Sequence, residues 1–342
     1  MTVRAKRTTM IDVARLAGVS TKTVSRVLNS EPYVTAAVRE RVEAAAKQLN
    51  YHPHVLAQGL VRRRSYLIGL VYENPSPSYV VELQMGVLER LKNERYRLMV
   101  IPVQSVRERG GEIVSLLRSA AIDGVVLGPP ASDHPAVLEE LAAIGMPHAR
   151  IAPTRMLAGG GSNLLDDIAA AREMAAYVIG LGHRDIAIIK GDPTHPASEA
   201  RLIGYSQAFA EAGIQVRLER IEQGLFTFDS GFAAARRLFA GSDRPTAILA
   251  QNDDMAVGAL VAAREAGLDV PGQLSIVGFD DSAVARTTWP QITTIRQPVF
   301  EMAAAAADMV ITALEDGVVP ADRVHPHELI VRSSAAPPPA RD

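Results

Sequence analysis

Cysteine is absent from the 342 residues. Disulfide bonds and thiolate metal sites are therefore excluded, and the composition is typical of a protein of the reducing cytoplasm. The sequence also lacks any run of about 18 uncharged apolar residues, which excludes transmembrane helices and a membrane partner. Its N-terminal stretch is positively charged but has no apolar segment and no small-residue cleavage site of the secretory kind, so we expect no signal peptide.

Motifs of common enzymes are missing as well. The sequence has no Walker A loop, no G-x-S-x-G elbow and no H-E-x-x-H helix, and GGGS at 159–162 does not fit the G-x-G-x-x-G fingerprint. No strand pattern immediately precedes that stretch, so we interpret it as a flexible crossover. The acidic pairs at 166–167 and 280–281 are expected to cap helix starts rather than to act in catalysis. We therefore expect no enzyme activity, no cofactor and no bound metal.

Charge is distributed unevenly along the chain, although the net charge is only −2. Residues 1–64 contain twelve Lys and Arg but four Asp and Glu, a net charge of +8, which leaves −10 for the remainder. A basic N-terminal module on an acidic body indicates a polyanion-binding arm attached to a body with another task. A solvated basic tail is the alternative, and charge alone does not decide between the two.

The basic N-terminal part shows the pattern of three short helices. Thr9 and Asp12 fit the capping box, in which two side chains satisfy free N–H groups at a helix start, and apolar residues then continue to Gly18, a natural stop. Ser20 is expected to cap the second helix and Thr35 the third. We expect the helices to cover about residues 10–17, 21–28 and 36–50.

From residue 65 the pattern changes to short apolar runs that alternate with helical stretches. This rhythm predicts parallel sheets covered by helices, and about 270 residues are more than one typical open sheet needs, which favours two doubly wound lobes. A TIM barrel is the structural alternative. The expected strands are 66–72, 96–103, 122–128, 148–152, 185–191, 216–221, 246–251, 274–280 and 328–332, and the clearest helices are 80–93, 167–182, 198–213 and 253–267.

Several motifs at fixed spacing carry a family resemblance. They are TMIDVARLAGVSTKTVSRVLN, VRERVEAAAKQLNYHP, SYLIGLV, LGHRDIAII, RLIGY, AQNDDMAVGAL, SIVGFDD and TTIRQP. Together they make the chain resemble the lactose/galactose-repressor (LacI/GalR) family over about residues 8–335. The resemblance implies an all-α helix-turn-helix headpiece followed by an α/β effector domain of two doubly wound parallel-sheet lobes, like a periplasmic binding protein.

The resemblance also implies a domain organisation. The segment 54–61 corresponds to a hinge helix that pairs with its dimer mate on DNA, and we expect it to fold only there because it is short and contains Gly59. The expected units are a headpiece at 1–53 with its helix-turn-helix motif at about 10–29, a hinge at 54–64, an effector-binding and dimerisation domain at 65–335 and a tail at 336–342. Lobe 1 would comprise about 65–163 and 296–324, and lobe 2 about 164–295 and 325–335.

DNA contacts are implied for the headpiece and hinge by the same resemblance. The N-terminal residues of a recognition helix reach base edges in the major groove, where an Arg–guanine pair contributes ~1–3 kcal/mol of discrimination. The implied major-groove residues are Thr21, Lys22 and Arg26. The implied phosphate contacts are Ser20, Thr23, Ser25, Asn29 and Tyr33, for which capping or turn formation is the alternative role. Ala57 and Leu60 match the minor-groove positions, with Leu60 as an apolar wedge.

An effector site is expected between the lobes, at the carboxyl ends of parallel strands. Carboxylates, amides, guanidinium groups and aromatic rings suit the hydroxyls and C–H faces of a sugar. The residues expected there are Tyr72, Asn74, Arg150, Arg201, Phe226, Asn252 and Asp280. The chain departs from many relatives at Ala152, where an acidic or hydroxyl residue is common, and at Val299, which can be aromatic.

We therefore expect a homodimeric, sequence-specific DNA-binding regulator, a repressor, in the cytoplasm and associated with the nucleoid. Its partners would be double-stranded, pseudo-palindromic operator DNA and a small effector, a sugar, that controls operator affinity allosterically. A non-sugar effector such as a nucleobase is the alternative. A solute-binding protein would share the body but not the headpiece, and an α/β enzyme stays open for any protein with a cleft.

Overall fold

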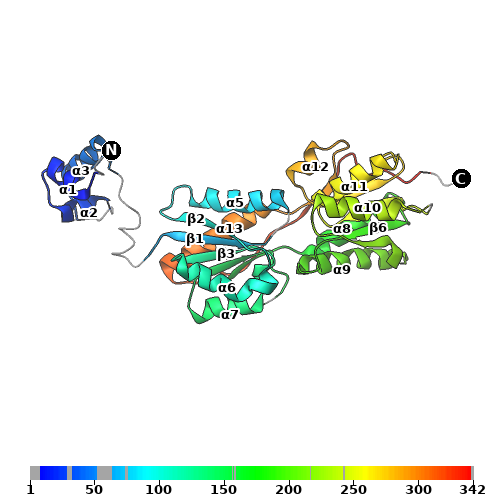
Figure 1. The fold of residues 1–342 in the computed structure, drawn as a ribbon, viewed down its shortest axis with the longest axis horizontal. Helices are drawn as coiled ribbons and strands as arrows, with labels where there is room; N and C mark the ends of the chain where they lie inside the picture. Colours follow the sequence, from blue (N-terminus) through cyan, green and yellow to red (C-terminus); the bar gives the residue numbers. More distant parts are fainter. Residues whose placement is uncertain are drawn as a thin grey trace, which may run out of the picture. The chain divides into compact units, whose positions relative to one another are not determined.

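The computed structural model describes residues 8–28, 33–51, 64–73, 76–155, 157, 159–215, 217–241 and 243–339. The chain divides into two compact units, residues 1–66 and 67–342 (Figure 1). Four residues with implied roles, Asn29, Ala57, Leu60 and Asn74, lie outside the described residues. The hinge segment 54–61 also lies outside them.

The described part of the first unit contains three helices around a small apolar core. They are α1 (Met10–Ala17), α2 (Thr21–Leu28) and α3 (Ala36–Gln48). Val13, Val24 and Val42 each have 0% exposure, so one valine from each helix forms the centre of the cluster. The three-helix prediction is confirmed, because apolar residues at helical spacing on each segment converge on a common core.

Capping explains where these helices begin and end. The Thr9 and Asp12 side chains form the predicted capping box, and Gly18 closes α1 with φ +65°, a conformation that glycine adopts without strain. The Thr23 N–H donates to Ser20 Oγ at 3.1 Å, so Ser20 caps α2 as expected. Thr35 precedes α3 but makes no capping hydrogen bond with its side chain, so that part of the prediction is wrong.

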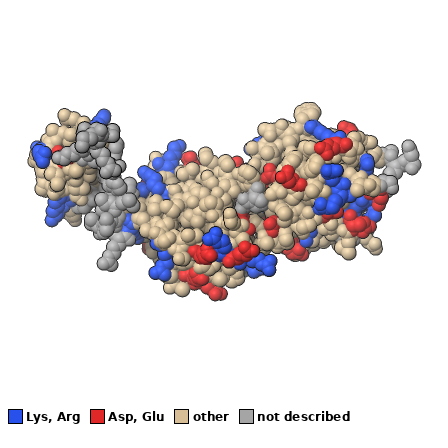
Figure 2. Space-filling model, in the orientation of Figure 1, with Lys and Arg blue, Asp and Glu red and all other residues tan. Residues whose placement is uncertain are grey.

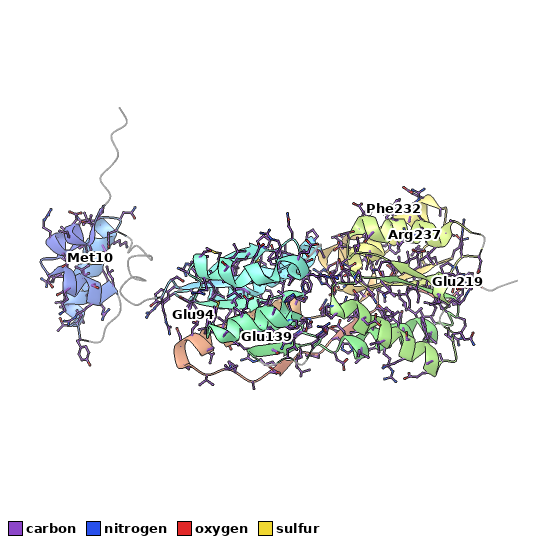
Figure 3. The ribbon with its side chains drawn as sticks, turned by 60° about the horizontal axis from the view of Figure 1, so that its bottom comes forward. Met10, Glu94, Glu139, Glu219, Phe232 and Arg237 are labelled. Atoms are coloured by element: carbon purple, nitrogen blue, oxygen red, sulfur yellow. The ribbon has the colours of Figure 1, made fainter. Side chains whose placement is uncertain are left out.

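Lobe 1 of the second unit is built on a parallel six-stranded sheet in the order β11-β5-β4-β3-β1-β2. Helices α5 and α13 cover one face, and α6 and α7 cover the other (Figure 1). Figure 3 shows α7, with Glu139, in front of this sheet. Its elements are β1 (Leu67–Tyr72), α5 (Pro77–Leu91), β2 (Arg97–Pro102), α6 (Val106–Ser119), β3 (Gly124–Leu127), η1 (Ala131–Asp133), α7 (Pro135–Ala143), β4 (His148–Ile151), β5 (Gly161–Leu164), α13 (Val299–Asp316) and β11 (Arg323–Val324).

Lobe 2 is a second six-stranded sheet in the order β12-β10-β9-β8-β6-β7, parallel except for β12 against β10. Helices α8 and α9 cover one face, and α10 and α11 cover the other. Its elements are α8 (Asp167–Gly180), β6 (Ile186–Lys190), α9 (Pro196–Glu211), η2 (Leu218–Arg220), β7 (Ile221–Gln223), α10 (Phe228–Phe239), β8 (Ala247–Ala250), α11 (Asp253–Glu265), β9 (Ser275–Asp280), α12 (Ala283–Thr287), β10 (Thr293–Arg296) and β12 (Glu328–Ile330).

Two open sheets confirm the expected fold class and rule out the TIM barrel, which would be one closed sheet of eight parallel strands. The described chain passes between the lobes at three places, after β5, after β10 and after β11. Both sheets therefore contain strands from distant parts of the sequence. Their carboxyl-terminal edges carry the loops from which an open parallel sheet binds its ligands.

Some local predictions fail for identifiable reasons. Residues 161–164 form β5 rather than a flexible crossover. A Cβ at Gly161 would lie 2.7 Å from Met309 Sδ, so glycine at this position lets α13 pack closely on the strand. The expected strand at 216–221 is mostly the short helix η2 followed by β7. The alternation of apolar and polar residues does not match the burial here. Leu218 is 82% exposed, whereas Arg220 is buried and pairs with Asp185 at 2.7 Å.

Candidate functional site

Helix α2, the expected recognition helix, presents polar and basic groups on its exposed side. Thr21 and Lys22 are exposed at the helix start, and Arg26 lies one turn after Lys22 on the same face. Arg39 Nη1 donates to the Val27 carbonyl at 3.2 Å, which ties α3 to the end of this helix. Exposed donors and cations at a helix start suit base edges and phosphates.

The expected phosphate contacts lie around this helix. Ser20 Oγ and Thr23 Oγ1 are 2.9 Å apart at its start, so Ser20 combines a cap with an exposed hydroxyl. Ser25 is half-buried, whereas Tyr33 is 88% exposed. An exposed tyrosine gains no apolar stabilisation from the core, which fits a residue whose hydroxyl contacts another molecule.

The largest concentration of expected effector residues lies in a cavity between the two lobes. The cavity has a volume of about 460 Å³, including its open mouth. Most of its wall residues follow the carboxyl ends of parallel strands of both sheets. The lining consists of Ser76, Tyr79, Pro129 and Ala152 from lobe 1, Asp167, His195, Ala197, Arg201, Phe226, Asn252 and Asp280 from lobe 2, and Gln297 from a crossover.

Arg201 is the charged centre of this cavity. Its Nε donates to Asp167 Oδ1 at 2.8 Å, its Nη1 donates to the Gln251 carbonyl at 2.5 Å, and its guanidinium carbon lies 3.6 Å from the Phe279 ring centroid. Asp280 Oδ1 lies 3.9 Å from Arg201 Nη1 and accepts a hydrogen bond from Gln297. Burial raises the pKa of Asp280 well above its usual range, although the nearby Arg201 opposes this shift.

His195 brings an unsatisfied polar atom to the cavity wall. The side chain is 4% exposed, and its Nε2 is buried with no hydrogen-bond partner. Burial lowers the pKa of His195 to about 4, and Arg201 adds to this effect while Asp192 opposes it, so the imidazole is neutral near pH 7. A buried polar atom left unpaired costs ~1–3 kcal/mol, which a ligand group bonded to Nε2 would recover.

Phe226 and Asn252 form a linked pair beside His195. Asn252 caps α11 by accepting from the Met255 N–H at 3.0 Å and donates to the Phe226 carbonyl at 2.9 Å. A Cβ at Gly191 would lie 2.0 Å from the Phe226 ring, so only glycine leaves room for the aromatic side chain there. Asn252 thus caps α11 and lines the cavity at the same time.

Backbone strain concentrates at the same cavity. Ala152, Phe226 and Asp280 line it with φ of +43°, +60° and +118°, in the region that favours glycine. Such conformations cost of order 1–3 kcal/mol each and persist where the surrounding structure enforces them, often at ligand sites. This clustering supports the cavity as a binding site independently of its polar groups.

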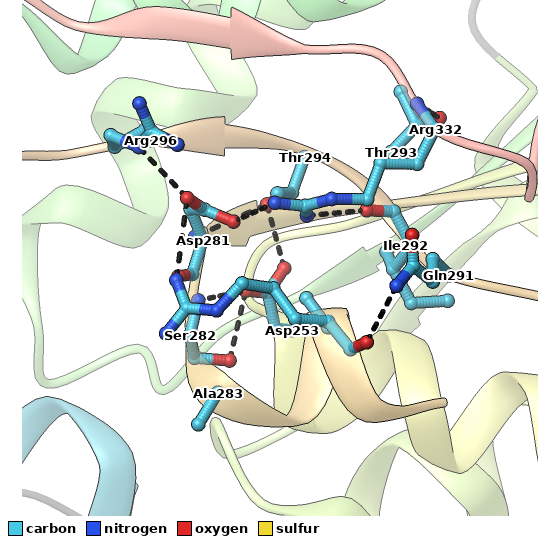
Figure 4. A network of polar contacts seen from close by, with 12 residues as sticks. Asp253, Asp281, Ser282, Ala283, Gln291, Ile292, Thr293, Thr294, Arg296 and Arg332 are labelled. Carbon is cyan, nitrogen blue, oxygen red and sulfur yellow. Dashed lines mark hydrogen bonds and ion pairs between the residues drawn. The ribbon is translucent and has the colours of Figure 1, made fainter. Parts of the chain in front are cut away.

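A buried polar network borders the cavity beneath the loop after β9 (Figure 4). Asp253 accepts from the Ser282 N–H at 2.7 Å and from Thr294 Oγ1 at 2.7 Å. Asp281 accepts from Arg296 Nε at 2.8 Å and from Arg332. Burial raises the pKa of Asp253 to about 7, while its hydrogen bonds to Thr294 and Ser282 act in the opposite direction.

Residues 9–54 match the family described as "Bacterial regulatory proteins, lacI family", and residues 175–335 match the "Periplasmic binding protein-like domain". The "HTH-type transcriptional regulator DegA" of Bacillus subtilis (strain 168) is 33% identical over 97% of this chain and 99% of its own length. The chain belongs to the LacI family. It is a DNA-binding transcriptional regulator with a helix-turn-helix headpiece.

Two further similarities extend over nearly the whole LacI-family chain. The "Ribose operon repressor" of Escherichia coli (strain K12) is 32% identical over 96% of this chain and 99% of its own length. A solved structure of the lac repressor dimer bound to operator and the anti-inducer ONPF has a TM-score of 0.84 and 28% identity, and the match covers 97% of this chain and 100% of that chain. The predicted family and fold class are thus confirmed.

Four of the seven expected effector residues of this LacI-family regulator come together at the cavity, namely Arg201, Phe226, Asn252 and Asp280. Arg150 does not line it. Its side chain is 1% exposed, and its guanidinium donates to the carbonyls of Ser132, Leu157 and Arg155 at 2.6–2.9 Å.

The placement therefore does not support Arg150 as an effector ligand. Its role is to join the loops that follow β3 and β4. Tyr72 is also outside the cavity lining, and Gln84 Nε2 lies 3.5 Å from its hydroxyl.

The acidic pairs have several roles, of which capping is only one. Asp166 caps α8 by accepting from the Ala169 N–H at 2.9 Å, as expected. Asp167 instead pairs with Arg201, and neither Asp280 nor Asp281 caps a helix. These three carboxylates are held by side chains from distant parts of the sequence, which a local capping rule does not detect.

Sequence reasoning missed His195, Tyr79, Gln297 and the cavity role of Asp167. A local signal existed for His195 and Gln297, because each follows an apolar strand in the loop region of its sheet. Within the described residues, no group of three or more His, Cys, Asp or Glu is arranged to hold a metal. None of the described helices is both long and apolar enough to cross a membrane.

Proposed function

We propose that this LacI-family regulator is a homodimeric repressor whose operator affinity is controlled by a sugar bound in the cavity between the lobes. The observation that carries the proposal is that both lobes contribute wall residues to one cavity. A ligand bound there contacts both lobes and stabilises one relative position of them. Binding would then shift an equilibrium between two states, as allosteric control requires.

The chemistry of the wall supports a sugar as the effector. Asp280, Asp167 and Arg201 offer acceptors and donors for vicinal hydroxyls, and Phe226 offers an aromatic ring for C–H faces. The names of two similar proteins, a ribose operon repressor and a lac repressor, also point to sugar-linked regulation. A nucleobase is the alternative effector, because a flat ring also packs on an aromatic side chain.

The headpiece supports operator recognition by Thr21, Lys22 and Arg26 on α2, with Ser20, Thr23, Ser25 and Tyr33 as phosphate contacts. One headpiece reads only a half-site, so two copies related by a two-fold axis would read a pseudo-palindrome. The hinge 54–61, with Ala57 and Leu60 as minor-groove residues, would connect this interface to the effector domain. Asn29 and Asn74 complete the proposed DNA and effector contacts, respectively.

An apolar stripe on α5 supports a homodimer. Val81, Met85 and Leu88 are 56%, 52% and 47% exposed and recur at helical spacing, so they share one face. Figure 2 shows few charged side chains over the middle of α5. The neighbouring edge strand β2 adds Val100, which is 37% exposed. A second copy of the same chain is the partner that we propose for this stripe.

The test is a DNA-binding titration of the purified full chain on the region upstream of its own gene, with and without a panel of sugars. We expect a specific complex whose affinity changes at least tenfold with one sugar. No specific complex under any condition would overturn the proposed repressor. A specific complex that responds to nucleobases but to no sugar would overturn the sugar and leave the repressor intact.

A further inference from the structure

The described wall of the cavity carries two acidic side chains and one basic side chain. In the described lining of this cavity, Asp167, Arg201 and Asp280 are the charged side chains. Two nitrogens of the Arg201 guanidinium are engaged, Nε by Asp167 at 2.8 Å and Nη1 by the Gln251 carbonyl at 2.5 Å. Asp167 therefore balances the charge of Arg201, and an anionic ligand would meet no excess positive charge in this lining.

A second cavity adjoins the first and shares Tyr79, Asp280 and Gln297 with it. It has a volume of about 740 Å³, including its open mouth. Two arginines line it, but Arg296 donates to Asp281 and to Glu328, and Arg286 donates to the Asp281 carbonyl. The same wall also carries Glu82, Asp281 and Glu301, so an anionic group that extends into this space gains no unpaired cation either.

His195 supplies the neutral recognition group of the first cavity. Its Nε2 is buried without a partner in a side chain that is 4% exposed. Its ring meets the Phe226 ring edge-on, with the centroids 5.5 Å apart. A ring nitrogen can either accept a hydrogen bond from a hydroxyl or donate one to it, depending on the tautomer, and a hydroxyl can do both.

We propose that the cavity selects an uncharged effector, that His195 is a specificity-determining residue that binds one of its hydroxyl or amide groups, and that Asp167 excludes anionic counterparts by balancing the charge of Arg201. The inference concerns the same cavity and so rests on the proposed function for its site. It goes further in excluding phosphorylated and carboxylated sugars as effectors. It also covers the nucleobase alternative, because an uncharged base satisfies it.

The first experiment is calorimetric titration of the full chain at pH 7.5 with matched neutral and anionic compounds. The probes are D-glucose against glucose 6-phosphate and glucuronate, D-ribose against ribose 5-phosphate, and uracil against orotate. We expect at least one neutral compound to bind, and to bind at least tenfold more tightly than its anionic counterparts. An anion that binds more tightly than its neutral counterpart, or a panel in which no neutral compound binds, overturns the inference.

These outcomes separate the two proposals. Selective binding of uracil supports an uncharged effector and overturns the sugar. Selective binding of ribose 5-phosphate or glucuronate keeps the sugar and overturns the uncharged effector. Failure of every compound counts against both.

The second experiment uses variants with the neutral compound that binds. We expect His195→Ala to weaken its binding at least tenfold and His195→Gln, which retains a side-chain N–H, to weaken it less. The control is His148→Gln, a buried histidine on β4 outside the cavity lining, which should leave the affinity unchanged. Unchanged affinity in His195→Ala, or an equal loss in the control, overturns the role of His195.

The third experiment addresses the exclusion of anions. We expect Asp167→Asn to reduce the preference for the neutral compound over its anionic counterpart at least threefold, because the carboxylate that balances the charge of Arg201 is removed. The ratio of the two affinities is the readout, so a general loss of binding does not imitate the effect. An unchanged ratio overturns the excluding role of Asp167.

Discussion

Arg201 Nε donates to Asp167 Oδ1 at 2.8 Å, and both side chains are buried, with 6% and 4% exposure. This pair joins α9 to α8 at the cavity between the lobes. The same two helices are also joined by Arg172 and Glu211, whose side chains are 51% and 55% exposed. The two ion pairs join the same helices but differ in burial, and Arg201 also donates to the Gln251 carbonyl.

Arg201→Met should lower the free energy of unfolding by about 3–5 kcal/mol, because it leaves Asp167 buried without its cation. Arg172→Met should lower it by less than about 1 kcal/mol, because water screens an exposed pair. Both changes remove one cation and keep a similar side-chain volume. Urea denaturation of the full chain, followed through the transition of the effector domain, gives both values. Equal losses in the two variants would contradict the importance of burial.

A pH dependence follows from His195. Its pKa is about 4 in the folded state against 6.5 ordinarily, so the unfolded chain binds more protons between these values. The stabilising contribution is full above pH 6.5 and is lost as the pH falls towards 4, by about 3 kcal/mol in total. Asp253 acts in the opposite sense, because its raised pKa of about 7 favours the folded state at low pH.

The His195 contribution is therefore measured as a difference between two proteins. The free energy of unfolding of the unaltered chain minus that of His195→Gln should rise by up to about 3 kcal/mol from pH 4 to pH 6.5 and stay constant above it. The Asp253 contribution is common to both proteins and cancels. A difference that does not change with pH would show that His195 titrates normally in the folded protein.

Arg26 on α2 should determine operator specificity. Arg26→Ala is expected to weaken operator binding by ~1–3 kcal/mol, about 5- to 150-fold, because a base-edge contact is lost, and to weaken binding to scrambled DNA less. The control is Arg15→Ala on α1, which removes the same charge from a side chain that is 77% exposed. Fluorescence anisotropy with both DNAs separates the effects. Parallel losses on operator and scrambled DNA in Arg26→Ala would make Arg26 a phosphate contact.

Local interactions explain which parts of the fold the sequence predicts well. Helix α1 begins and ends as expected, because Thr9, Asp12 and Gly18 act within one turn of the helix termini. The alternation of strands and helices likewise reflects regular apolar spacing. Strand β5 has no such signal, because its glycine serves a contact with Met309, which lies about 150 residues later in the sequence.

The candidate site shows the same limit. Arg201, Phe226, Asn252 and Asp280 could be named from the family resemblance and from their places after strands. Arg150 could not be assigned correctly, because a buried arginine bonded to backbone carbonyls looks the same in sequence as one that faces a ligand. Positions in a sequence indicate which loop a side chain belongs to, whereas tertiary packing decides which way that side chain points.

The apolar stripe on α5 gives the last prediction. Met85→Glu places a charge in the middle of Val81, Met85 and Leu88, so burial against a second copy would desolvate an unpaired carboxylate. We expect the variant to be monomeric by analytical ultracentrifugation and to lose most of its operator affinity, because one headpiece reads only a half-site. Its affinity for the effector should stay within about threefold, because Met85 is not in the cavity lining.

Leu116→Glu is the matched control for that change. Leu116 on α6 is 46% exposed, close to the 52% of Met85, but lies on the opposite face of the first sheet. This variant should keep the dimer and the operator affinity, since an exposed surface away from the stripe tolerates a charge. If Met85→Glu stays dimeric while Leu116→Glu becomes monomeric, the dimer forms through the α6 side. If both stay dimeric, neither helix forms the interface, and the α5 stripe has another role.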